Sequence, residues 1–147
     1  MKQITVKALD NGTVIDHIPA DEIFKVVEIL NLKEEFMVLG TNFSSKKMGR
    51  KGIIKIADKE LNENELNKLA LVTPNATINV IKDGEVKEKK QVKLPEKVEN
   101  LVQCGNAGCI TRFENVSTKF HVVAKNPVTL KCHFCEKTFM RNELVLR

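Results

Sequence analysis

Four cysteines constrain the fold of this chain more than any other feature of its sequence. They are Cys104, Cys109, Cys132 and Cys135, in the arrangement Cys-x4-Cys-x22-Cys-x2-Cys. Two close pairs separated by a strand-sized insertion suit a tetrahedral Zn²⁺ ion, because each pair can fold as a turn that points two thiolates at one ion. Four thiolates leave no position open for water or substrate. We therefore predict one structural zinc ion per chain.

Disulfide bonds are the alternative use of these cysteines, and they need an oxidising compartment. The sequence MKQITVKALD at the amino terminus lacks the charged segment and continuous apolar run of a secretory signal. The longest apolar runs, Phe36–Leu39 and Leu69–Val72, are far shorter than the roughly 20 residues that cross a bilayer. We expect a cytoplasmic protein with no membrane span, so zinc is favoured over disulfides. His133 lies inside the second cysteine pair and is expected to face solvent rather than bind the metal.

A short polar segment, Lys93–Lys97 with the sequence KLPEK, precedes all four cysteines and is the natural domain boundary. We predict a first domain over residues 1–93 and a second over residues 98–147. The second has about 50 residues, too few to bury a sufficient apolar core unaided. Zinc binding, worth roughly 10–16 kcal/mol in peptides of this kind, would supply the missing stability.

The first domain mixes strand and helix patterns. Strand patterns cover residues 4–8, 14–18, 36–43, 53–56 and 78–80, and a hairpin returns from Val86 after Asp83-Gly84. One helix follows Pro19 with Asp21 as its N-cap, and a second begins at an Asn62–Glu65 capping box and stops before Pro74. Residues 44–52 are predicted to form a loop. The fold class is α+β: an antiparallel sheet with two helices on one face, then a small antiparallel β zinc-binding domain.

The net charge of +5 and a pI near 9.0 raise the possibility of nucleic-acid binding. Most lysines, however, alternate with acidic residues, as in DKELNENELNK, which is typical of a solvated face. Tyr and Trp are absent, and the seven Phe form no aromatic-basic motif for base stacking. A zinc-ribbon nucleic-acid-binding protein remains the alternative interpretation.

The sequence contains no phosphate-binding P-loop, no dinucleotide fingerprint and no nucleophile elbow. One polar pair, Asp16-His17, interrupts an otherwise apolar strand. A basic set comprises Lys46, Lys47, Arg50, Lys51 and Lys55. Such lysines can neutralise a polyphosphate and an aspartate can accept hydrogen bonds from ribose hydroxyls. On these residues alone, an exposed loop beside a strand edge is the favoured interpretation.

Four stretches resemble one known family in order along the chain. They are NGTVIDHIPA (11–20), MGRKGIIKI (48–56), LALVTPNATIN (69–79) and the two cysteine pairs, so the resemblance extends from about residue 3 to residue 145. The chain is similar to regulatory chains of aspartate carbamoyltransferase. This resemblance implies a ferredoxin-like nucleotide-binding domain that pairs with itself and a zinc domain that contacts the catalytic chain. It also implies a non-catalytic subunit that binds CTP, UTP or ATP and bridges catalytic trimers in pyrimidine biosynthesis, with no membrane or nucleic-acid partner.

The resemblance also assigns the nucleotide site. It implies that the base contacts Val6, Lys7, Ala8 and Leu9, and that Asp16 binds the ribose hydroxyls. It also implies that Lys55 contacts the base or ribose. The phosphates are expected to face His17, Lys51 and Lys89, with Asn79 and Val86 beside them. Lys7 stands where the family usually has an acidic residue, and Gly84 where a larger side chain occurs. A free-standing nucleotide-binding module without an enzyme partner is the second alternative.

Overall fold

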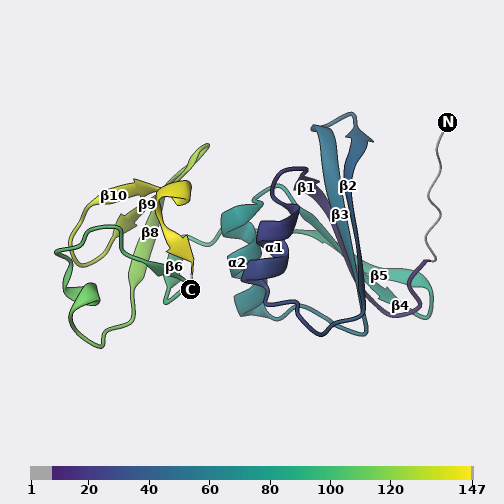
Figure 1. The fold of residues 1–147 in the computed structure, drawn as a ribbon, viewed down its shortest axis with the longest axis horizontal. Coiled ribbons are helices and arrows are strands. Elements are labelled where there is room, and N and C mark those ends of the chain that lie inside the picture. Colours follow the sequence, from purple (N-terminus) through teal and green to yellow (C-terminus); the bar gives the residue numbers. More distant parts are fainter. Residues whose placement is uncertain (1–7, 147) are drawn as a thin grey trace.

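The computed structural model describes residues 8–146, which form two parts joined by a short segment (Figure 1). The first part has seven elements: β1 (Gly12–Pro19), α1 (Ile23–Ile29), β2 (Met37–Ser45), β3 (Gly49–Ala57), α2 (Glu63–Val72), β4 (Thr77–Lys82) and β5 (Glu85–Gln91). Its five strands pair antiparallel in the order β2-β3-β1-β4-β5. No helix within residues 8–146 is long and apolar enough to span a membrane.

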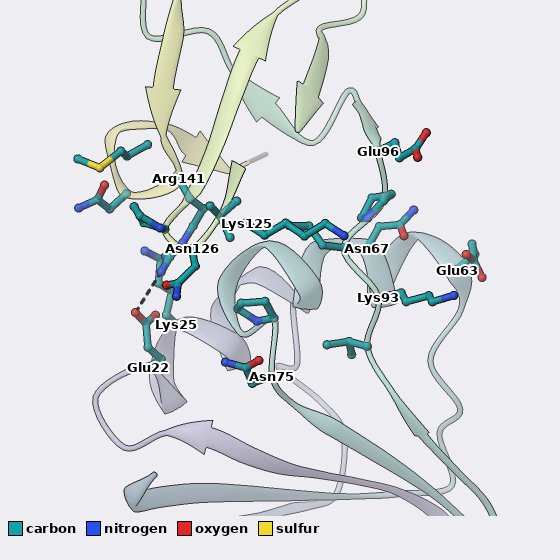
Figure 2. Close-up of a pocket in the computed structure, with 18 residues that line it drawn as sticks. Glu22, Lys25, Glu63, Asn67, Asn75, Lys93, Glu96, Lys125, Asn126 and Arg141 are labelled. Atoms are coloured by element: carbon teal, nitrogen blue, oxygen red, sulfur yellow. Dashed lines mark ion pairs between the residues drawn. The ribbon is translucent and has the colours of Figure 1, made fainter. Parts of the chain in front are cut away.

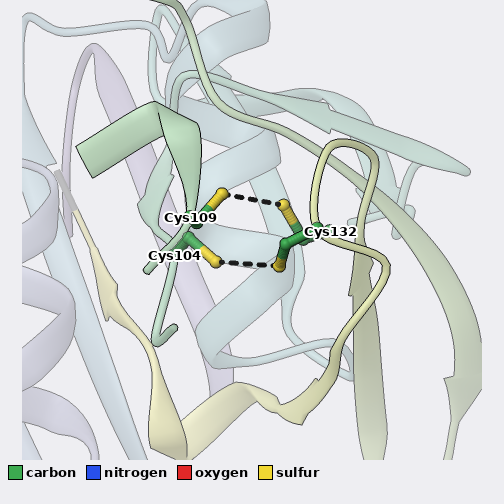
Figure 3. Close-up of side chains that lie close together, drawn as sticks. Cys104, Cys109 and Cys132 are labelled. Carbon is green, nitrogen blue, oxygen red and sulfur yellow. Dashed lines mark hydrogen bonds between the residues drawn. The ribbon is translucent and has the colours of Figure 1, made fainter. Parts of the chain in front are cut away.

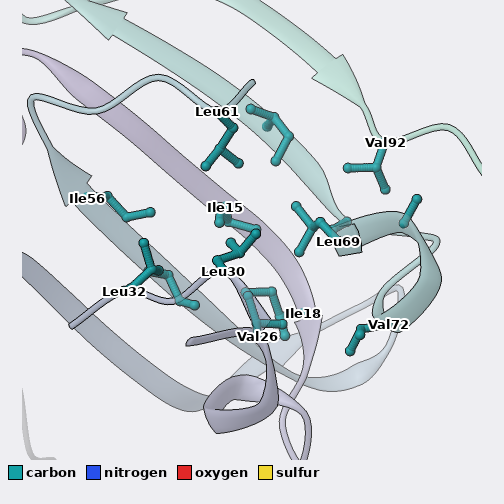
Figure 4. Close-up of a cluster of buried hydrophobic side chains, with 14 of the residues drawn as sticks. Ile15, Ile18, Val26, Leu30, Leu32, Ile56, Leu61, Leu69, Val72 and Val92 are labelled. Atoms are coloured by element: carbon teal, nitrogen blue, oxygen red, sulfur yellow. The ribbon is translucent and has the colours of Figure 1, made fainter. Parts of the chain in front are cut away.

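The two faces of this sheet have different roles. Ile15, Ile54 and Ile78 lie opposite one another on adjacent strands and are almost fully buried. Together with apolar side chains of α1 and α2 they form the first core (Figure 4). Both helices therefore cover the same face, and they lie between the sheet and the second part of the chain (Figure 1). Side chains alternate along a strand, so the residues directly before and after each of these isoleucines point to the other face of the sheet. We call this second face the open face.

Several local predictions for the first part are confirmed. Asn62 Oδ1 accepts a hydrogen bond from the Glu65 amide at 2.8 Å, and Glu65 Oε1 accepts one from the Asn62 amide at 3.1 Å, which completes the capping box. The second helix ends at Val72, before Pro74. Asp83 and Gly84 both have positive φ, 53° and 78°, as a two-residue type I′ hairpin requires.

Two local predictions are wrong. Asp21 does not cap α1, because the helix begins at Ile23 with Glu22 in the N-cap position and without a side-chain cap. Residues 44–52 are not a loop: β2 continues to Ser45 and β3 restarts at Gly49, so only the turn between them is irregular. Backbone hydrogen bonds extend this hairpin although its sequence is polar. The strand predicted over residues 4–8 lies outside the described residues except for Ala8, which precedes β1 without regular structure.

The second part is built from short β elements: β6 (Lys97–Glu99), β7 (Val102–Gln103), the 3-10 helix η1 (Ile110–Arg112), β8 (Lys119–Lys125), β9 (Val128–Cys132), β10 (Thr138–Met140), the 3-10 helix η2 (Arg141–Glu143) and β11 (Val145–Leu146). Four of the strands form an antiparallel sheet, β10-β9-β8-β6, and β11 pairs with β7. Phe120 and Leu130 are fully buried in its core with three of the cysteines. An α+β chain with a small, mainly β second part is therefore confirmed.

An apolar contact joins the two parts. Leu71 of α2 is buried in the core of the second part, while Leu94 and Leu146 pack against both cores. The connecting segment is hydrogen-bonded at both ends, since the Val92 amide donates to Ala76 and the Val122 amide donates to Glu96. The two parts therefore touch through a few side chains beside the connection.

The capping box makes a measurable prediction. Asn62→Ala removes the side-chain acceptor for the Glu65 amide, so the free energy of unfolding should fall by about 1 kcal/mol. Asn64→Ala is the matched control, because Asn64 lies inside the same helix and its substitution should be neutral or slightly stabilising. Urea denaturation of the full chain measures both. Equal effects of the two substitutions would contradict the capping role.

Candidate functional site

The four cysteines converge from distant points of the sequence. Cys104 follows β7, Cys109 precedes η1, Cys132 ends β9 and Cys135 lies in the turn before β10. Their four Sγ atoms all lie within 4.8 Å of one another. Figure 3 shows the side chains of Cys104, Cys109 and Cys132 directed into a common space between the two loops. This group of four sulfurs is positioned to bind a metal ion.

The separations fit a metal better than disulfides. The Sγ atoms of Cys104 and Cys135 are 3.7 Å apart, and those of Cys109 and Cys132 are 3.8 Å apart. A disulfide bond requires about 2.05 Å. Four sulfurs placed tetrahedrally about 2.3 Å from an ion would be separated by about 3.8 Å. These two distances therefore match two edges of a sulfur tetrahedron, and all four cysteines are free thiols.

Backbone hydrogen bonds hold both loops in shape. In the first, the Cys109 amide donates to the Asn106 carbonyl at 3.0 Å, and Arg112 Nη1 donates to the Cys104 carbonyl at 2.8 Å. In the second, the Glu136 amide donates to the Cys132 carbonyl at 3.0 Å, with Glu136 itself in the left-handed region at φ 63°. Each loop is thus a tight turn that presents two sulfurs on one side.

The electrostatics of the cluster favour a bound cation. Burial raises the pKa of the Cys104 thiol to about 12 and also raises the pKa of Cys132. Burial acts the same way on Cys109, but hydrogen bonds from Thr111 outweigh it and lower the pKa. At Cys135, a backbone amide hydrogen bond and other donors outweigh burial and lower the pKa to about 7. Neighbouring thiolates repel one another, so ionising all four requires a positive ion between them.

His133 is not part of the sulfur cluster. It is exposed, and its Nδ1 lies 3.0 Å from Nε2 of His121 on β8. The metal-ligand group found within residues 8–146 contains the four cysteines alone. This agrees with the expectation that His133 faces solvent.

Three of the residues assigned to the nucleotide site lie in one row across the sheet, which also contains Val14. Val14 of β1 is paired with Lys55 of β3 on one side and with Asn79 of β4 on the other, and Asn79 is paired with Lys89 of β5. All of these side chains project from the open face, because their neighbours in the strands face the helices. Val86 also belongs to this face, opposite Ile81. Pairing between strands thus brings Lys55, Asn79 and Lys89 together.

Asp16 and His17 lie at the end of β1, where the strand bulges. The regular pairing with β3 is interrupted between Ile15 and Ile18, and His17 has a positive φ of 61°. Lys51 Nζ lies 2.9 Å from Asp16 Oδ1 and 3.1 Å from Oδ2. Burial alone would raise the pKa of Asp16, but the hydrogen bonds from Lys51 and from the His17 amide, together with the Lys51 charge, lower it. Asp16 is therefore held as a carboxylate.

The remaining assigned residues are placed less fully. Ala8 is exposed and Leu9 is partly buried, just before β1. Val6 and Lys7 lie outside the described residues. Sequence reasoning missed Thr77, whose Oγ1 lies 2.8 Å from His17 Nδ1 and whose position on β4 is opposite Asp16. Only the pairing of β1 with β4 reveals this contact, since the two residues are far apart in the sequence.

Comparisons with known proteins agree with both parts. The family model described as "Aspartate carbamoyltransferase regulatory chain, allosteric domain" matches residues 4–93, and the one described as "metal binding domain" of the same chain matches residues 96–145. The regulatory chain of Thermococcus sibiricus is 49% identical over 146 residues, which cover 99% of this chain and 97% of that relative. That of Phocaeicola vulgatus is 50% identical over 136 residues, or 91% and 88% of the two chains. That of Parabacteroides distasonis is 45% identical over 148 residues, or 99% and 96%.

An α+β chain with a four-thiol metal centre and full-length similarity of this kind belongs to a class of regulatory proteins. Specifically, the chain belongs to the family of aspartate carbamoyltransferase regulatory chains. The resemblance found in the sequence is thereby confirmed. So is the expectation that this is a regulatory and not a catalytic chain.

The sulfur geometry predicts that the purified chain holds one tightly bound metal ion. Cys109→Ser should lose the metal and unfold the second part, because removing a ligand opens the coordination sphere. His133→Ser, in the other cysteine loop, is the control and should retain the metal. Elemental analysis with circular dichroism measures both outcomes. Full metal content in the Cys109→Ser protein would contradict a four-cysteine site.

Proposed function

We propose that this chain is the nucleotide-binding regulatory subunit of aspartate carbamoyltransferase. It binds CTP, UTP or ATP on the open face of the five-stranded sheet and links catalytic trimers through its metal-binding part, in pyrimidine biosynthesis. The observation that carries the nucleotide assignment is the row that places Lys55, Asn79 and Lys89 on one face of the four adjacent strands β3, β1, β4 and β5. The family assignment supports the partner.

The chemistry of the open face suits a nucleoside triphosphate. Lys89 on the edge strand and His17 beside β4 can bind phosphate oxygens, because charged donors form the strongest hydrogen bonds to anions. Lys55, on β3 at the end of the row opposite Lys89, is available to the base or ribose. Asp16 accepts bonds from Lys51 and from the His17 amide. Its two oxygens have about four lone-pair sites, so acceptor capacity remains for ribose hydroxyls.

The strand order supports a ferredoxin-like first domain. Its first six elements run β-α-β-β-α-β. The four strands among them lie in the order β2-β3-β1-β4, and both helices cover one face. In this assignment β5 is an added edge strand. We assign residues 1–93 to this domain and 98–147 to the metal-binding domain, a division supported by the two separate cores.

We assign zinc to the sulfur cluster, as a structural ion. Soft thiolate ligands in a tetrahedral arrangement favour zinc over magnesium, calcium or manganese. In such a site Cys104, Cys109, Cys132 and Cys135 would hold the ion, which would supply the positive charge that the thiolates need. The small size of the second core supports a stabilising role for this ion.

Exposed apolar residues support self-association through the first domain. β2 is an edge strand of the sheet, and Phe36 beside it is 83% exposed. Val38, Leu39 and Phe43 of the same strand are also exposed. Unpaired edge strands with apolar side chains are favourable surfaces for pairing with a second chain. We assign this edge to the dimer contact.

The nucleic-acid alternative has less support. Lys51, Lys55 and Lys89 have a proposed role in the open-face site, and both parts match regulatory-chain family models. Affinity for DNA or RNA that falls by orders of magnitude between about 50 and 200 mM salt would favour the alternative. A cytoplasmic location remains a prediction from the sequence.

Substitution of Lys89 tests the nucleotide site. A charge-assisted contact to phosphate is worth roughly 1.5–3 kcal/mol, so Lys89→Ala should weaken CTP or ATP binding by about ten-fold or more. Lys90→Ala is the matched control: Lys90 is paired with the buried Ile78 and therefore lies on the helix side of the same strand. Calorimetry of the full chain measures both affinities. Equal binding by wild-type and Lys89→Ala chains would show that the pocket is misassigned.

Removal of the metal tests the partner assignment. Chelation should prevent the chain from co-eluting with catalytic trimers, because the metal-binding part would unfold. Restoring Zn²⁺ should restore the complex. Assembly that persists in metal-free chain would exclude the metal-binding part as the contact surface.

A further inference from the structure

The boundary between the two parts has a closed side and an open side. On the closed side, Leu71, Leu94 and Leu146 make the apolar contact that joins both cores. On the open side lies a cleft of about 1160 Å³, lined by residues from both parts (Figure 2). A cleft beside a small apolar contact allows the parts to rock about that contact, because few packed side chains resist the motion.

One ion pair crosses this cleft. Arg141 Nη2 of the second part lies 3.5 Å from Glu22 Oε1 of the first, and each side chain is only 20% exposed. Figure 2 shows the pair bridging the two parts at the cleft. The other five ion pairs between described residues each join residues of the same part. Glu22 and Arg141 therefore form the charged connection between the parts within residues 8–146.

This ion pair is incomplete. Glu22 Oε2 and Arg141 Nη1 are both buried, and neither has a hydrogen-bond partner among the described residues. An arginine and a carboxylate can form two parallel hydrogen bonds of about 2.7–2.9 Å. A small closure of the cleft would bring the pair to that geometry and satisfy both atoms, while opening would expose both to water. Either movement removes the unfavourable state of two buried, unpaired polar atoms.

Each partner is fixed to its own part. The Glu22 amide donates to the Pro19 carbonyl at the end of β1 at 2.9 Å, and Glu22 leads directly into α1. Arg141 begins η2, directly after β10, and β10 is paired with the strand that ends at Cys132. The separation of Glu22 and Arg141 therefore follows the relative position of the two parts.

The position of Glu22 also connects it to the assigned nucleotide residues. Asp16 and His17 lie in the bulge of β1, one short turn before Glu22. A ligand that moves this bulge would move the start of α1. The same displacement would reach the cleft through the turn of a few residues that the Glu22 amide closes by donating to the Pro19 carbonyl.

We propose that Glu22 and Arg141 form a two-position latch that couples nucleotide binding in the first part to the orientation of the metal-binding part. This inference rests on the proposed function for its ligand, a nucleoside triphosphate. The two side chains interact across the boundary between the parts, and their two hydrogen bonds form or break together. The latch is closed when both hydrogen bonds form and released when the cleft opens.

The assembled enzyme tests the latch through its response to CTP or ATP. Glu22→Gln removes the charge with little change of shape, and Arg141→Lys removes the fork of donors. Each should reduce the nucleotide-induced shift in aspartate half-saturation by about two-fold or more. Nucleotide affinity, measured by calorimetry, should be retained. Glu63→Gln is the matched control, because Glu63 lines the same cleft without an ion pair to the other part. An unchanged shift in both latch variants overturns the proposal.

A charge exchange separates the latch from a failure of the nucleotide assignment. Glu22→Arg and Arg141→Glu should each lower the midpoint of thermal unfolding of the full metal-loaded chain, and the double variant should recover part of the loss. Strictly additive effects overturn the latch, whether or not nucleotides bind. If the wild-type chain binds neither CTP nor ATP and the midpoints are non-additive, the nucleotide function is rejected. The pair then remains a latch between the parts.

Discussion

Four sulfur atoms that cannot all be ionised without a cation determine the second part of this chain. The sequence around them offers only short strands, and Phe120 and Leu130 are the large apolar side chains of this part that are fully buried. Three of the four cysteines belong to that core, so the metal site and the apolar core are one structure. Loss of the ion would place repelling or unpaired thiols at the centre of the part. In the proposed function, the surface that this part offers to the catalytic chain therefore depends on metal coordination.

In the proposed function, the first part separates stability from recognition by using the two faces of one sheet. Isoleucines on the helix side supply the core, while the alternating positions carry Lys55, Asn79 and Lys89 on the open side. Substitution on the open face can therefore alter binding with little effect on packing. In the proposed function, the bulge at Asp16 and His17 connects the two faces, because it interrupts the pairing of β1 with β3 and is followed by the start of α1. A bound ligand that displaced the bulge would therefore displace the helix layer.

The sequence predicted those features that depend on neighbours along the chain. The capping box of Asn62 and Glu65, the Asp83-Gly84 turn and the convergence of the cysteines all follow from short spacings. The N-cap of α1 was mispredicted because an acidic pair, Asp21 and Glu22, offers two similar starting points. The hairpin at residues 44–52 was mispredicted as a loop because its polar strands lack an apolar pattern. Contacts between distant residues, such as His17 with Thr77 and Glu22 with Arg141, depend on strand pairing and domain contact. Neither has a signature in a single sequence.

The proposed function requires this chain to transmit the binding of a nucleotide to a catalytic partner. Reciprocal titration of the assembled enzyme tests it most directly, because coupled equilibria must affect each other by the same factor. CTP or ATP affinity is measured with and without a saturating, unreactive analogue of the two substrates, and analogue affinity is measured with and without the nucleotide. We expect equal changes in both directions, typically about 5- to 150-fold for coupled sites. Nucleotide affinity that is the same with and without the analogue would contradict it.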